Sequence, residues 1–131
     1  MTIEELLQRP YWIIDILPRL VSADSPGQYF TVERYFRTAR RAEVQRRKLF
    51  LLLKLNCYRS LTLVSGGTDP APEELAAALE REETFLLVDD ALITADPEDT
   101  YLTVYAPDEA LISLLRELAV GEGLYIWQPP T

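Results

Sequence analysis

The longest regular pattern of hydrophobic and polar positions runs from Val32 to Tyr58. Leucines and aromatic residues recur there at helical spacing, and most of the basic residues of the chain lie in the same segment. One helix over residues 26–56 would be about 46 Å long, whereas a compact chain of this length is only about 36 Å across. We therefore predict a break near residues 38–41, followed by a second helix whose leucine-rich part, residues 49–55, belongs to the core.

Shorter hydrophobic runs predict the remaining elements. Runs of β-branched and aromatic residues indicate strands, which we expect at residues 11–17, 58–64, 85–88, 91–94, 101–105 and 124–127. Capping signals and leucine spacing indicate helices at residues 2–8, after Pro72 and from Pro107 to Gly121. This order predicts the α+β class. We expect a single compact domain over residues 1–131, with a mixed sheet of about five strands and helices mainly on one face.

Composition limits the chemistry that is open to this chain. Its 131 residues, of which 48% are hydrophobic, are enough for a core without disulfide bonds. The single cysteine, Cys57, has apolar neighbours and is predicted to be a reduced thiol in the core. The sequence contains no histidine, which removes the usual general base at neutral pH and the commonest transition-metal ligand. These features favour a non-enzymatic protein without a cofactor.

No hydrophobic run approaches the length needed to cross a bilayer, and the first residues form an acidic amphipathic segment unlike a signal peptide. We therefore expect a cytoplasmic protein that does not contact a membrane.

The net charge of −8 is unevenly distributed. Residues 1–68 contain 11 basic and 6 acidic residues, a net charge of +5, whereas residues 69–131 contain 2 basic and 15 acidic residues, a net charge of −13. Such an asymmetry is typical of a nucleic-acid surface, of halves that attract each other, or of subunits that pair. We expect the basic helical segment to be neutralised by the acidic half, in the same chain or in a neighbouring subunit.

The basic residues cluster between positions 34 and 48, where a phosphate-binding surface is one interpretation. The alternative, which we favour, is a solvated or ion-paired face of a packed helix. The candidate binding residues are Arg37, Arg40, Arg41, Arg46, Arg47 and Lys48.

Acidic residues gather in two predicted turns, Asp89–Asp90 and residues 96–99. Carboxylate oxygens are the ligands of hard cations, but the spacing differs from that of an EF-hand loop. Turn residues at strand ends are the preferred interpretation, so no metal site is predicted. A carboxylate-dependent enzyme around Asp89, Asp90 and Asp99 remains a third functional hypothesis.

Two further features of the predicted strands bear on function. Asp15 is the one charged residue of its strand, and we expect it to face outward. The strand aromatics are expected to pack on the sheet, although they are also the residue type that stacks on nucleic-acid bases. These aromatics are Tyr11, Trp12, Tyr101, Tyr105, Tyr125 and Trp127.

The sequence thus favours a non-catalytic binding or regulatory module that acts through protein–protein contacts, including self-association. The alternative is a nucleic-acid-binding protein that uses the basic segment 34–48.

Overall fold

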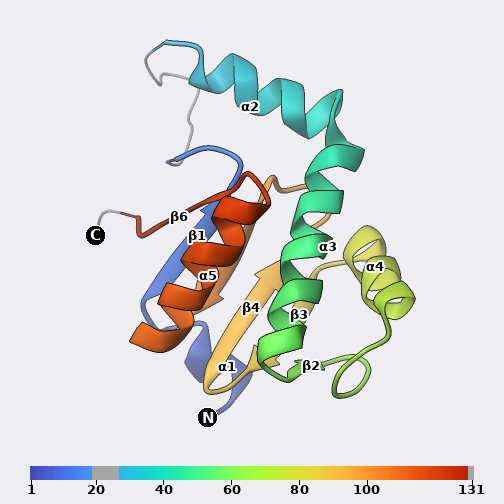
Figure 1. Ribbon diagram of the computed structural model, residues 1–131, viewed down its shortest axis with the longest axis vertical. Coiled ribbons are helices and arrows are strands. Elements are labelled where there is room, and N and C mark those ends of the chain that lie inside the picture. The colour runs from blue at the N-terminus through green and yellow to red at the C-terminus, as the bar shows by residue number, and fades with distance from the viewer. Residues whose placement is uncertain (19–26, 130–131) are drawn as a thin grey trace.

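The computed structural model describes residues 1–18 and 27–129 as an α+β fold built on a single sheet (Figure 1). Five helices are present in these residues: α1 (Ile3–Leu6), α2 (Tyr29–Thr38), α3 (Arg41–Tyr58), α4 (Pro72–Arg81) and α5 (Glu109–Gly121). The strands are β1 (Tyr11–Asp15), β2 (Leu61–Leu63), β3 (Thr84–Val88), β4 (Ala91–Ala95), β5 (Tyr101–Tyr105) and β6 (Tyr125–Trp127). The helix start that the sequence places at Pro26 lies outside the described residues.

The six strands form one sheet in the order β2-β3-β4-β5-β1-β6, and each neighbouring pair is antiparallel. The sequence predicts about five strands, one fewer than the structure has. It also predicts a mixed sheet, because β5, α5 and β6 resemble a parallel strand–helix–strand unit. In the structure β1 lies between β5 and β6 and pairs antiparallel with both, so the two parallel strands never become neighbours.

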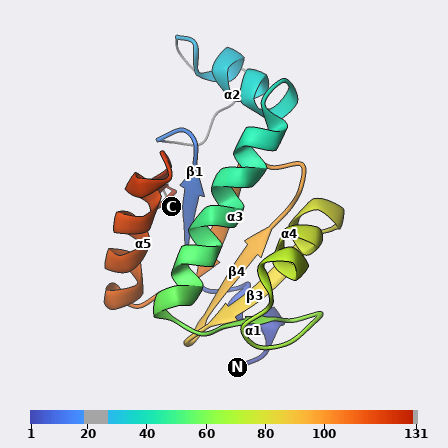
Figure 2. The same cartoon turned by 45° about the vertical axis from the view of Figure 1, so that its right-hand side comes forward.

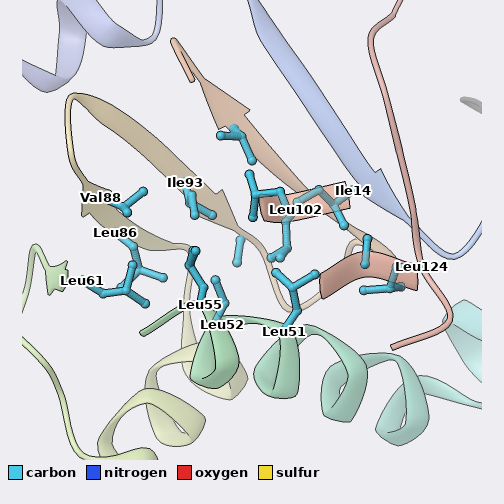
Figure 3. Close-up of a cluster of buried hydrophobic side chains, with 14 of the residues drawn as sticks. Ile14, Leu51, Leu52, Leu55, Leu61, Leu86, Val88, Ile93, Leu102 and Leu124 are labelled. Carbon is cyan, nitrogen blue, oxygen red and sulfur yellow. The ribbon is translucent and has the colours of Figure 1, made fainter. Parts of the chain in front are cut away.

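Three helices, α3, α4 and α5, cover one face of the sheet, with α3 in the middle (Figures 1 and 2). Leu51, Leu52 and Leu55 of α3 are fully buried against sheet residues such as Leu102 and Ile93 (Figure 3). The prediction that residues 49–55 belong to the core is confirmed for these three leucines. Each fully buried leucine contributes roughly 1.5–3 kcal/mol of transfer free energy.

The predicted break in the long helical segment is confirmed. α2 ends at Thr38, and α3 begins at Arg41 in a different direction (Figure 1). The buried face of α3 consists of Val44, Lys48, Leu51, Leu52 and Leu55. A lysine therefore occupies the buried position one helical turn after Val44, within an otherwise apolar face. α3 also extends to Tyr58, which shortens the strand predicted at residues 58–64 to β2.

The opposite face of the sheet is covered much less. The short helix α1 lies there, away from α3 (Figure 3), and its buried Leu6 belongs, like Leu92 of β4, to the buried residues outside the main core cluster. Within the described residues, none of the helices has the length and apolar character needed to traverse a bilayer.

Candidate functional site

Five of the six predicted binding residues are arginines, and the structure gives each of them a partner. Arg37 pairs with Glu33 at 3.2 Å, Arg41 with Glu98 at 3.3 Å, and Arg46 with both carboxylate oxygens of Glu43 at 2.6 and 2.7 Å. Exposed pairs of this kind contribute little to stability, because water and salt screen them.

The remaining two arginines also have defined contacts. Arg40 donates to the hydroxyl of Tyr35 at 3.0 Å. Arg47 donates to Glu43 at 3.1 Å and to the Gly123 carbonyl at 3.3 Å. Arg46 and Arg47 together hold the pKa of the Glu43 carboxyl below its ordinary value.

The acidic half of the chain, residues 69–131, therefore neutralises only part of the basic helical segment. Within the candidate set, Arg41 alone reaches a carboxylate of residues 69–131, because Glu33 and Glu43 lie closer to the other arginines on the same helices. Two ion pairs outside the set, Lys54–Glu122 and Arg59–Asp89, do connect the halves.

The sixth candidate, Lys48, does not belong to a basic surface. It is 1% exposed, and its Nζ donates to the carbonyl oxygens of Asp96 at 3.1 Å and Asp99 at 2.9 Å. Burial lowers the pKa of the Lys48 amine to about 8. The sequence does contain a signal for this position, since Lys48 precedes Leu52 by four residues and Leu51 by three, on the buried side of the helix.

A buried carboxyl group lies near the same end of the sheet. Asp15 at the end of β1 is 3% exposed, and its Oδ1 accepts hydrogen bonds from the Thr100 hydroxyl at 2.9 Å and the Ile16 amide at 2.6 Å. The prediction that Asp15 faces outward is wrong, because its carboxylate is buried and receives hydrogen bonds from Thr100, just before β5, and from Ile16, just after β1. Burial raises the pKa of this carboxyl to about 6.

The two acidic turns do not meet. Asp89 and Asp90 join β3 to β4, whereas residues 96–99 join β4 to β5, so the turns lie at opposite ends of β4, about 17 Å apart for a five-residue strand. Asp89 takes a φ of +52° and pairs with Arg59, and Asp96 accepts from the Glu98 amide at 2.9 Å. Asp89, Asp90 and Asp99 therefore form no common site. No cluster of three metal-ligating side chains occurs in residues 1–18 and 27–129.

Cys57 is exposed, so the prediction of a core thiol is wrong. It lies two residues after the buried Leu55, which is about 200° around the helix axis, and its Sγ contacts the Leu53 carbonyl oxygen at 3.5 Å.

A groove of about 600 Å³ lies between α3 and α4; we call it the α3–α4 groove. Its apolar lining consists of Ala42, Leu49, Ala76 and Leu79. Its polar lining consists of Arg41, Gln45, Arg46 and Glu80. Two of the predicted binding residues, Arg41 and Arg46, thus border the same concave surface, and their side chains remain 46% and 52% exposed.

Gln45 gives this groove an unusual polar group. Its Nε2 donates to the Leu79 carbonyl at 3.0 Å, which fixes the orientation of the side-chain amide across the two helices. The Oε1 atom is buried and has no hydrogen-bond partner among the described residues. Leaving such an acceptor unpaired costs about 1–3 kcal/mol.

Neither protein-family models, nor curated proteins, nor solved structures give a significant match to this chain.

Proposed function

We propose that this protein is a non-catalytic binding module that takes a segment of a partner protein into the α3–α4 groove. The observation that carries the proposal is the combination of an apolar lining with two half-exposed arginines in one concavity. A volume of about 600 Å³ lies within the range of roughly 300–1,000 Å³ that is usual for binding sites.

The lining defines the chemistry of the segment. Leu49, Leu79 and the two alanines accept an apolar side chain, which gains free energy as it leaves water. Arg41 and Arg46 favour a carboxylate beside it, because each holds its present carboxylate only through an exposed pair that is worth little. The expected partner segment is therefore apolar and acidic, the composition of one face of an amphipathic helix.

Several features favour binding over catalysis. The chain lacks histidine, and the titratable groups with strongly shifted pKa values, Lys48 and Asp15, are enclosed away from the groove lining. The absence of disulfide-forming cysteine pairs keeps a cytoplasmic location as our expectation.

Selection from a displayed library of random peptides tests the proposal. Peptides enriched on the wild-type protein should contain apolar residues together with Asp or Glu. Their binding should weaken at least tenfold in Ala42→Trp, which fills the groove from an exposed position, and in Arg41→Glu/Arg46→Glu. Ala77→Trp is the matched control, because Ala77 lies on α4 outside the groove lining and should leave binding unchanged.

Two results contradict the proposal: enrichment of peptides that bind Ala42→Trp as well as wild type, or failure to enrich any peptide. Nucleic-acid binding by residues 34–48 is the competing proposal. It requires oligonucleotide affinity that falls about 10³-fold or more between 50 and 200 mM salt for six or more phosphate contacts.

A further inference from the structure

The two arginines that line the α3–α4 groove differ in how their charge is balanced. Arg46 and its neighbour Arg47 share the single carboxylate of Glu43, at 2.6 and 3.1 Å, so these three side chains together keep one net positive charge. Arg41 instead pairs one to one with Glu98, at 3.3 Å. The Arg46 side of the groove therefore attracts a further carboxylate, whereas the charge of Arg41 is already balanced.

The carboxylate beside Arg41 comes from outside the two helices that form the groove. Glu98 belongs to the turn between β4 and β5, it is not part of the groove lining, and its side chain is 76% exposed. Its closest approach to Arg41, between Oε1 and Nη1, is 3.3 Å, whereas both oxygens of Glu43 lie within 2.7 Å of Arg46. The pair of Arg41 with Glu98 is the looser of the two, and it is open to exchange with a ligand.

The turn that carries Glu98 is held in place independently of this ion pair. The Lys48 amine donates to the carbonyls of Asp96 and Asp99, and the Glu98 amide donates to Asp96 Oδ1 at 2.9 Å. The carboxylates of the two aspartates interact electrostatically with Lys48, so Glu98 is the acid that the turn presents to the groove rim. Because its side chain does not hold the turn together, Glu98 can release Arg41 and still remain beside it at a high effective concentration.

We infer that Glu98 is an internal competitor of the groove ligand, which masks Arg41 and leaves Arg46 as the primary anchor for a carboxylate. The inference rests on the proposed function, because it assigns the regulation of the same groove. Masking does not require complete displacement. Two carboxylates beside one guanidinium repel each other, so Glu98 lowers the affinity for an acidic ligand whether it stays on Arg41 or leaves it.

Titration with two small probes tests the inference. Phenylbutyrate carries an apolar ring and a carboxylate, and phenylbutyramide has nearly the same shape without the charge. The dissociation constant of each probe is measured from the amide NMR shifts of the groove residues Ala42, Gln45 and Ala76. The ratio of the two constants is the preference of the groove for a carboxylate.

The wild type should prefer the carboxylate, through Arg46. Arg46→Gln should abolish this preference, because Arg41 and Arg47 then each have a carboxylate of their own. Adding Glu98→Gln to Arg46→Gln should restore a preference of about twofold to fivefold, the strength of an exposed ion pair, because Arg41 is then unmasked. The amide spectra of the same samples show that each variant is folded.

Asp90→Asn is the matched control. It removes the same charge from an exposed position in the other acidic turn, at the far end of β4, so Arg46→Gln/Asp90→Asn should behave like Arg46→Gln. The inference is overturned if Glu98→Gln restores no preference, if Asp90→Asn restores as much, or if Glu98→Gln tightens phenylbutyramide equally, which would show a steric effect. These results would leave the proposed function standing. If neither probe shifts the groove amides in any of these proteins, the proposed function fails, and the inference fails with it.

Discussion

The Nζ atom of Lys48 lies 2.9 Å from the carbonyl oxygen of Asp99, and this contact connects the middle of α3 to the turn between β4 and β5. A second bond from the same amine, to Asp96, holds the other side of the turn. Arg41 pairs with Glu98 in this turn and also lines the α3–α4 groove, so one turn is fixed to α3 at two places.

The amine of Lys48 should make stability depend on alkaline pH. Its pKa is about 8 in the folded chain, against 10.5 for an ordinary lysine. Between these values the unfolded chain keeps a proton that the folded chain has released, so the free energy of unfolding rises with pH. The total rise is on the order of 3 kcal/mol. Urea unfolding of wild type from pH 7.5 to 10.5 measures this rise.

Lys48→Met should remove this increase, whereas Lys54→Met, which changes a half-exposed lysine on the same helix, should keep it. Parallel pH profiles for wild type and Lys48→Met would show that the amine titrates normally in the folded protein.

Asp15 should have the opposite effect at acidic pH. Its pKa is about 6 in the folded chain and about 3.8 when unfolded, so between these values the folded chain holds the additional proton. The stability contributed by this proton is complete below pH 3.8 and is lost as the pH rises through 6, by an amount on the order of 3 kcal/mol. In Asp15→Asn, which keeps the acceptor for Thr100 and Ile16, this loss should disappear. Asp15→Asn should then be at least as stable as wild type at pH 7.5, and a variant that is much less stable there would contradict the assignment.

Leu52 and Leu53 form a matched pair for testing the core. Leu52 is fully buried beneath the sheet, whereas Leu53, its neighbour, is only partly buried. Leu52→Ala should cost about 2–5 kcal/mol of unfolding free energy, and Leu53→Ala clearly less, since its side chain leaves a smaller cavity. Equal losses in chemical denaturation would show that α3 is rotated about its axis relative to the structure described.

Divalent metal ions should not stabilise the protein specifically. The two acidic turns are separated by the length of β4, and their carboxylates already serve the turns or pair with Arg59. Specific binding at a hundredfold excess over Kd would add about 2.7 kcal/mol. Thermal melts with millimolar Mg²⁺, Ca²⁺ or Mn²⁺, compared with chelator, should therefore coincide. A saturable rise in Tm that is lost in Asp89→Asn/Asp90→Asn would reveal a site at the β3–β4 turn.

The hydrophobic pattern was sufficient to predict the class of fold, the break between α2 and α3 and the buried leucines. These features depend on local periodicity and on a limit set by chain length. The position of β1 between β5 and β6 was not predictable in this way, because strand order depends on contacts between residues far apart in the sequence.

The errors at individual polar residues have a common cause. Lys48 and Asp15 were assigned to the surface because isolated charges are rarely buried. Both are buried because the β4–β5 turn supplies hydrogen-bond partners for them. These are two backbone carbonyls for Lys48 and the Thr100 hydroxyl for Asp15. The α3–α4 groove could not be predicted, because it forms only where two helices pack together. The sequence indicates the apolar face of each helix but not which helices pack side by side.

The weak attachment of α2 to the rest of the fold has a consequence for the local dynamics of the chain. α2 has no fully buried residue, no side-chain hydrogen bond at its N-terminal cap and no acidic residue in its first turn, and it packs mainly on α3. A helix of ten residues with so little support is marginal by itself. Its amide hydrogens should therefore exchange with solvent through local opening, orders of magnitude faster than those of Leu51–Leu55 in α3, which exchange only when the whole sheet layer comes apart.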